Sequence, residues 1–140
     1  MGLAVSFDCW EGPYSSFNRW RTGLARAAGY AVAPLGGGEL HPVVDWGHVD
    51  QARMQGEWDR VPCTIVGEPD PLLILLTHAD NEGRIKAEHC GPLADRLDEL
   101  VSVLPVEHDP ELGGSWQGVT RQFIVGLRDA VEEGEDVEFE

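Results

Sequence analysis

A run of apolar residues from Leu72 to Leu76 stops at Thr77 and gives way at once to the polar, glycine-containing segment 78–85. A short continuous apolar run bounded by polar residues and glycine is typical of a buried strand. In α/β domains, the loop that follows such a strand often carries catalytic or binding contacts. The sequence therefore predicts a central strand over 72–77 and a candidate site in the loop after it.

Hydrophobic periodicity divides much of the remaining chain into strands and helices. Apolar residues at helical spacing predict long amphipathic helices, and alternation of apolar and charged residues predicts a half-buried final strand. The expected elements are a strand over 3–7, a helix over 17–28 capped by Ser15 or Ser16, a helix over 91–104 begun by Gly91 and Pro92, a helix over 116–133 capped by Ser115, and a strand around Val137 and Phe139 whose charged neighbours suit a sheet edge.

Between residues 31 and 71 the periodic signals weaken, because prolines and the glycines 36–38 interrupt the pattern. Loops of this length in small domains are functional or disordered, and tryptophans argue against disorder. Within it we expect a short strand near 40–46, a short helix near 49–58 and an extended segment near 61–66.

The fold class that follows is α/β, or α+β. We expect one compact domain over residues 1–140, with a small mixed sheet, about three helices packed on it, and 31–71 as a long loop-rich excursion. The strands near Leu3 and Leu72 are expected at the centre of the sheet. If they are parallel neighbours, Asp8 and Asp80 lie close together at their ends.

The net charge of the chain is −15. Such a charge repels nucleic acid and anionic lipid and speeds association with a basic protein, although it also serves solubility alone. No apolar stretch is long enough to span a membrane, and the three widely spaced cysteines favour a reducing cytoplasm. Glycines 36–38 lack the lysine of a phosphate-binding loop, and no dinucleotide fingerprint follows the first strand, so no cofactor is expected.

The loop after the predicted central strand offers acid–base chemistry. Asp80 and Glu82 could act as acid and base, His78 could join Asp80, and Asp8 lies at the end of the first strand. Cys9 could be a nucleophile if His78 lies across the strand ends. The alternative interpretation is structural, because Asp, Asn and Gly form turns and buried cysteines fill apolar space.

A metal site is not favoured, although some residues have suitable spacing. His41, Asp45 and His48 could converge on zinc or iron if the backbone turns there, and His78 could add a fourth ligand. The alternative is a loop folded over an aromatic anchor.

Aromatic side chains beside carboxylates suit a surface that grips a basic protein. Arg21 lies beside the apolar stripe of the first helix, so we expect it to pair with a carboxylate such as Asp8 or Asp80. The residues assigned to binding are Trp10, Tyr14, Arg21, Trp46, Trp58, Asp80 and Glu82. The alternative is that the rings cap the core and the acidic residues are solvated.

Segments 6–15, 77–85 and 123–139 resemble a family of small uncharacterised bacterial proteins, mainly from actinobacteria. The resemblance spans most of the chain and brings no activity, ligand or site residue with it. In that family the central loop reads H-S-D-x-D-G, and Ala79 and Glu82 depart from this pattern, which weighs against a metal.

Together these features favour a cytoplasmic binding protein of the immunity or inhibitor type, whose acidic surface engages a basic protein partner. A homodimer formed through exposed aromatic residues is a further interpretation. The alternative function is a small hydrolase, with or without a metal, whose site lies at the strand ends near Phe7 and Thr77.

Overall fold

The computed structural model of the protein describes residues 2–28, 32–34, 40–42, 71–76 and 83–140. Their principal sheet has four strands in the order β2-β1-β8-β5, and every pairing in it is antiparallel. Its strands are β1 (Gly2–Val5), β2 (Trp10–Pro13), β5 (Gly83–Ile85) and β8 (Val137–Phe139). The expected α/β class is confirmed in its α+β form, whereas the expected mixture of strand directions is not found in this sheet.

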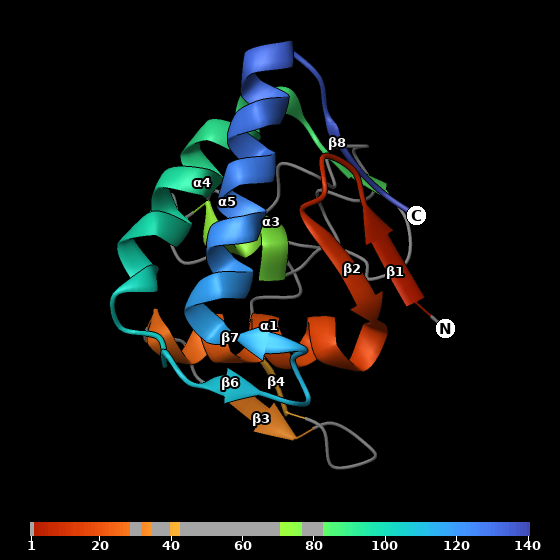
Figure 1. The fold of residues 1–140 in the computed structure, drawn as a ribbon. Helices are drawn as coiled ribbons and strands as arrows, with labels where there is room; N and C mark the ends of the chain where they lie inside the picture. Colours follow the sequence, from red (N-terminus) through yellow and green to blue (C-terminus); the bar gives the residue numbers. More distant parts are fainter. Residues whose placement is uncertain (1, 29–31, 35–39, 43–70, 77–82) are drawn as a thin grey trace.

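Helices cover one face of the sheet, and two small hairpins lie apart from it (Figure 1). The helices are α1 (Tyr14–Ala27), α3 (Leu72–Leu76), α4 (Ala87–Val101) and α5 (Trp116–Glu133). One hairpin pairs β3 (Val32–Pro34) with β4 (Leu40–Pro42), and the other pairs β6 (His108–Asp109) with β7 (Gly114–Ser115). No described helix has the length and apolar character needed to cross a membrane.

The prediction of a central strand at Leu72 is wrong, because these residues form the short helix α3. Leu72, Ile74 and Leu75 are all buried. A short apolar run buried on every side has no period to distinguish a strand from a helix. The expected parallel pairing of this segment with the first strand is therefore wrong as well, and β1 lies between β2 and β8 instead.

The two long helices at the ends of the chain begin differently. At α5 the Ser115 hydroxyl accepts a hydrogen bond from the Gly118 N–H, as predicted, and Gly134 ends the helix in the left-handed conformation with φ of 69°. At α1 the helix already begins at Tyr14, so neither Ser15 nor Ser16 caps it. The N-cap residue is Pro13, whose side chain has no acceptor.

Two other boundaries also differ from the prediction. α4 begins at Ala87 rather than at Gly91, and Pro92 lies inside the helix. The Asp136 carboxylate accepts a hydrogen bond from the Ala87 N–H at 2.8 Å, which satisfies a donor at this earlier start. The final strand is confirmed, but it lies inside the sheet between β1 and β5 rather than at an edge.

Aromatic rings fill the space between the sheet and the helices. The Trp10 ring stacks on Trp20 with centroids 5.1 Å apart, and Phe17 meets Phe139 edge to face at 5.8 Å. Trp20 also packs on Phe123 of α5, at 4.8 Å. This cluster joins β2, β8, α1 and α5, so residues from both ends of the chain form one core.

In the expected 31–71 excursion, the predicted strand near 40–46 corresponds to β4, which pairs with β3. The helix expected near 49–58 and the extended segment near 61–66 lie outside the described residues.

Candidate functional site

Many of the predicted site residues, from the 31–71 excursion and from the loop after the apolar run, lie outside the described part of the chain. These are Asp45, Trp46, His48, Trp58, His78, Asp80 and Glu82. His41 lies in β4, but its side chain is not described. Among the described residues, no group of three or more His, Cys, Asp and Glu side chains could hold a metal ion.

Cys9 is buried and does not suit the role of a nucleophile. Burial, with smaller contributions from Cys90, Asp129 and Asp8, raises the pKa of its thiol to about 12. Cys90 is buried too, and desolvation raises the pKa of its thiol to about 11. Because the thiolate is the reactive form, both cysteines are inert fillers of the core.

Trp10 is a core residue and not part of a binding surface, which corrects its assignment as a contact for a partner. It is 5% exposed, and Tyr14 packs partly buried against the same core. Trp10 points inward because it stands opposite Val5 in the β1–β2 register, on the buried side of both strands. The sequence assigned it to a binding surface, whereas it begins strand β2 and its ring lies in the core.

Arg21 is buried, at 8% exposure, and it links α1 to α3. Its guanidinium donates a hydrogen bond to the Leu75 carbonyl at 3.3 Å and another to the Asn18 side chain, and it lies over the Phe17 ring at 4.6 Å. Asp8 is exposed in the β1–β2 turn, where its carbonyl accepts a hydrogen bond from Gln122. The partners described for Arg21 include a carbonyl, an amide and a ring. Asp80 lies outside the described residues, so the expected pairing of Arg21 with a carboxylate stays a prediction.

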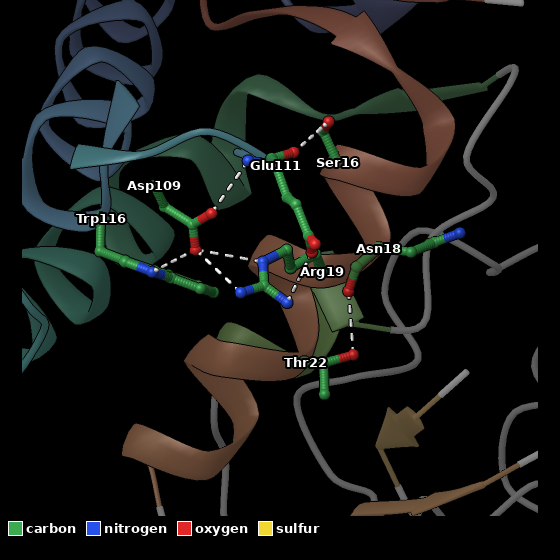
Figure 2. A network of polar contacts seen from close by, with 7 residues as sticks. All are labelled: Ser16, Asn18, Arg19, Thr22, Asp109, Glu111 and Trp116. Carbon is green, nitrogen blue, oxygen red and sulfur yellow. Dashed lines mark hydrogen bonds and ion pairs between the residues drawn. The ribbon is translucent and has the colours of Figure 1, made fainter. Parts of the chain in front are cut away.

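A polar network holds the β6–β7 hairpin against α1 (Figure 2). One oxygen of Asp109 accepts hydrogen bonds from Arg19 at 2.9 and 3.1 Å and from the Trp116 indole at 3.1 Å. The Ser16 hydroxyl donates to the Glu111 carbonyl at 2.6 Å, and Arg19 also pairs with the Glu111 carboxylate at 3.1 Å.

The hydrogen bond from Arg19, with help from Trp116 and the Glu111 N–H, lowers the pKa of Asp109. Sequence analysis missed this network, because Arg19 and Asp109 are 90 residues apart and nothing local links them. Every polar group named in it has its partner inside the protein, so we interpret it as a brace for the fold.

The β1–β2 turn is strained and tightly packed. Phe7 and Asp8 both have positive φ, 58° and 57°, which is unfavourable for residues other than glycine. A Cβ placed on Gly126 of α5 would lie 2.4 Å from the Cys9 sulfur and 2.8 Å from the Phe7 carbonyl oxygen. The glycine therefore allows α5 to approach the turn closely and hold it.

Three cavities lie around this turn and the strands that it joins. One of about 370 Å³ is lined by Ser6, Phe7, Gly134, Glu135, Asp136 and Glu138. A second, of about 530 Å³, lies along β1 and β2 and is lined by Gly2, Leu3, Ala4, Glu11, Gly12, Pro13 and Glu140. A third, of about 250 Å³, lies where β2 meets α1 and the β6–β7 hairpin.

The second cavity opens on the face of the sheet away from the helices, which we call the outer face. Small residues, Gly2 and Ala4, form its floor, and the carboxylates of Glu11 and Glu140 stand beside it. Ala4 lies opposite Glu11 on one side and exchanges backbone hydrogen bonds with Glu140 on the other. The two carboxylates therefore flank β1, with a shallow, uncharged strip between them.

Comparison of the chain with models of protein families, with curated proteins and with solved structures finds no match. The resemblance to the actinobacterial family therefore stays a prediction. The hydrolase interpretation also stays a prediction, since His78 and Asp80 lie outside the described residues and Cys9 is buried.

Proposed function

We propose that the protein is a cytoplasmic binding protein of the immunity or inhibitor type, and that it engages a basic protein partner through the outer face of its sheet. The observation that carries this proposal is the set of exposed carboxylates on that face. Glu11, Glu138 and Glu140 are exposed on neighbouring strands, and none of them forms an ion pair within the described part of the chain.

Three carboxylates of helix α4, in contrast, are paired with arginines. Asp95 and Asp98 of α4 lie 3.4 and 3.7 Å from the guanidinium of Arg128, and Glu99 lies 3.0 Å from Arg96. Because these acids already have cationic partners, they offer less to an incoming protein. The unpaired carboxylates on the outer face keep their charge available.

The outer face also suits contact with an extended basic segment. Its small floor residues allow close approach, and carboxylates on both sides can accept hydrogen bonds from Arg or Lys. A basic partner would be steered toward this face by the net charge of −15, and the association rate would fall as salt is added. Trp46 and Trp58 stay candidates for aromatic anchors, whereas Trp10 does not.

The test compares two variants with equal changes of charge. In the first, Glu11, Glu138 and Glu140 are replaced by Gln; in the second, the exposed Glu107, Glu132 and Glu133 are replaced by Gln. The probe is a peptide of alternating Arg and Ser, titrated by calorimetry at low and at physiological salt. We expect the outer-face variant to bind about tenfold more weakly than the wild type, and the control variant to lose much less.

Equal losses in the two variants would overturn the proposal, because binding would then depend on net charge alone. Absence of binding to the wild-type protein at either salt concentration would overturn it as well. Thermal unfolding of both variants checks that the sheet is intact, and exposed glutamates should change the stability little.

A further inference from the structure

Strand β2 lies at one end of the principal sheet, and among the described strands it pairs with β1 alone. The hydrogen bonds of β1 determine which backbone groups of β2 this pairing uses. Ala4 exchanges backbone hydrogen bonds with Glu140, beside β8, at 2.8 and 3.0 Å. Because successive residues of an antiparallel strand direct their backbone groups to opposite sides, Leu3 and Val5 direct theirs toward β2.

The same alternation assigns the backbone groups of β2. Trp10 and Gly12 stand opposite Val5 and Leu3 in the register, so they are the residues that exchange hydrogen bonds with β1. Glu11, between them, directs its N–H and its carbonyl away from β1. Within the described part of the chain, neither of these two groups has a hydrogen-bond partner. We call this side of β2 the free edge.

The cavity of about 250 Å³ lies along the free edge. Residues 9–13 line it, and no residue of β1 does, which places it on the side of β2 away from β1. Pro110 and Leu112 of the β6–β7 hairpin and Val119 of α5 form the other side. The backbone of Glu11 therefore borders a space bounded by side chains from two other elements.

A free strand edge can bind an extended peptide, because its N–H and carbonyl groups pair with those of the added strand. At β2, one residue of the peptide would exchange two backbone hydrogen bonds with Glu11. Residues that pair in this way place their side chains on the same face of the sheet. The side chain of the paired residue would therefore stand beside the Glu11 carboxylate on the outer face, and the side chains before and after it would point to the helix side.

Charge and size define which side chains suit these positions. Glu11 also lines the outer-face cavity together with Glu140, and neither carboxylate forms an ion pair within the described residues. A cationic side chain therefore suits the paired position. Since liquid water occupies about 30 Å³ per molecule, the space beside the edge has room for only about eight water molecules. Small side chains therefore suit the positions before and after the paired residue.

We propose that an extended segment of the basic partner adds to the sheet as a strand beside β2. An Arg or Lys of this segment pairs with Glu11, and small residues precede and follow it. This inference rests on the proposed function, because it assigns the way in which the basic partner binds. Main-chain pairing at the free edge adds a contact that depends on the conformation of the segment and not only on its charge.

Two methylated forms of one peptide separate pairing from charge. The parent peptide is Ala-Arg-Ala-Arg-Ala with blocked ends. One form carries methyl groups on the backbone nitrogens of both arginines, and the other carries them on the alanine that follows each arginine. The arginine N–H would donate to the Glu11 carbonyl, whereas the alanine N–H would point away from β2. In calorimetric titrations we expect methylation at arginine to weaken binding about tenfold more than methylation at alanine.

Two substitutions at residue 11 examine the free edge itself. Glu11→Gln removes the charge, whereas Glu11→Pro removes the charge and the backbone N–H. Proline is tolerated in an edge strand where its nitrogen is directed away from the sheet, so the pairing of β2 with β1 should persist. Affinity for the parent peptide should fall about threefold in Glu11→Gln and about tenfold further in Glu11→Pro.

Hydrogen exchange followed by NMR gives a measurement on the wild-type protein. We expect the Glu11 amide to exchange quickly in the free protein and to be protected when the parent peptide is bound. The amides of Trp10 and Gly12, which pair with β1, should be protected in both states. This measurement does not depend on how the Glu11→Pro variant folds.

Equal affinity for the two methylated peptides would overturn the strand pairing, and so would a Glu11 amide whose exchange is unchanged at saturating peptide. Neither result would overturn the proposed function, which is tested by the outer-face glutamine variant and its control. If that variant and its control lost affinity equally, the proposed function would fail. A tenfold effect of methylation at arginine would still support pairing at the free edge in that case.

Discussion

The two faces of the principal sheet have opposite characters, although they are built from alternate residues of the same four short strands. On the inner face Leu3, Val5, Ile85, Val137 and Phe139 are buried under the helices. On the outer face the residues between them are exposed, and Glu11, Glu138 and Glu140 stand there without ion pairs in the described part of the chain. The inner face stabilises the fold, whereas these outer-face side chains are exposed.

The comparison distinguishes two kinds of carboxylate in this acidic protein: those that hold elements of the fold together, and those that are exposed without an ion pair in the described part of the chain. Asp109 and Asp136 have partners far away in the sequence, in Arg19 and Arg84, and each also receives a backbone N–H. Carboxylates of this kind position elements. The glutamates of the outer face position nothing that the structure describes, so changing them should alter binding and leave the fold intact.

The largest expected effect on stability comes from replacing, one at a time, two neighbouring residues that lie on opposite faces of the sheet. Phe139→Ala should lower the free energy of unfolding by about 3–5 kcal/mol, because it removes a buried ring that packs on Phe17. Glu138→Ala, one residue away on the outer face, should change it by less than about 0.5 kcal/mol. Urea unfolding followed by tryptophan fluorescence measures both changes. Similar losses of unfolding free energy in the two variants would contradict the difference between the faces.

A smaller effect is expected where α5 touches the β1–β2 turn. Gly126→Ala should cost about 1–3 kcal/mol, since the new Cβ would clash with the Cys9 sulfur and the Phe7 carbonyl. Gly91→Ala in α4 is the matched control, because its Cβ would lie at an ordinary 3.8 Å from Val131. We expect the control to lose less stability than Gly126→Ala, because its Cβ meets no clash in the core and only the position before Pro92 disfavours alanine. A destabilised control and an unaffected Gly126→Ala variant would show that the turn is not held by this contact.

A smaller effect again is expected at Ser6, where β1 meets β8. Its hydroxyl accepts a hydrogen bond from the Glu138 N–H at 2.8 Å, while its carbonyl accepts one from the Cys9 N–H in the turn. Ser6→Ala should cost about 0.5–1.5 kcal/mol through the lost hydrogen bond. The exposed Ser15→Ala variant serves as the control for a serine outside the sheet, and hydrogen exchange at the Glu138 amide should accelerate only in Ser6→Ala.

The smallest expected effect is a dependence of the stability on pH that comes from the paired carboxylate of Asp109. The pKa of Asp109 is lower in the folded protein than its ordinary value, chiefly because of the hydrogen bond from Arg19. Its contribution to stability is therefore present above the ordinary carboxyl pKa and is lost as the pH falls through the lowered one.

Thermal unfolding from neutral to strongly acidic pH tests this expectation. Asp109→Asn should be slightly less stable than the wild type at neutral pH, and the difference should vanish in acid. Parallel curves for the wild type and Asp109→Asn would contradict the role given to Arg19.

Features of the sequence that act locally predicted the structure well. Ser115 and Gly134 mark the two ends of α5, and alternation at Val137 and Phe139 predicted β8. Caps and period-two patterns depend on a few neighbouring residues, so they can be interpreted without knowing the fold.

Features that depend on distant partners were missed. The Leu72 run is a helix because of what surrounds it, and the start of α4 depends on Asp136, 49 residues beyond Ala87. The cavity beside Trp10 combines β2, α1 and the β6–β7 hairpin, which no spacing along the chain brings together. The sequence assigned Trp10 to a binding surface, because the rings that bury it come from another element of the fold.

The place of β8 in the middle of the sheet also sets the order of events during synthesis. β1 and β2 can pair early, since a turn of a few residues joins them, but β5 has no contact with β1 in the sheet except through β8. The ribosome must therefore release residues up to Phe139 before the sheet can close. Until then β1 lacks its partner strand on the side away from β2, and closure of the sheet waits for contacts between segments far apart in the chain.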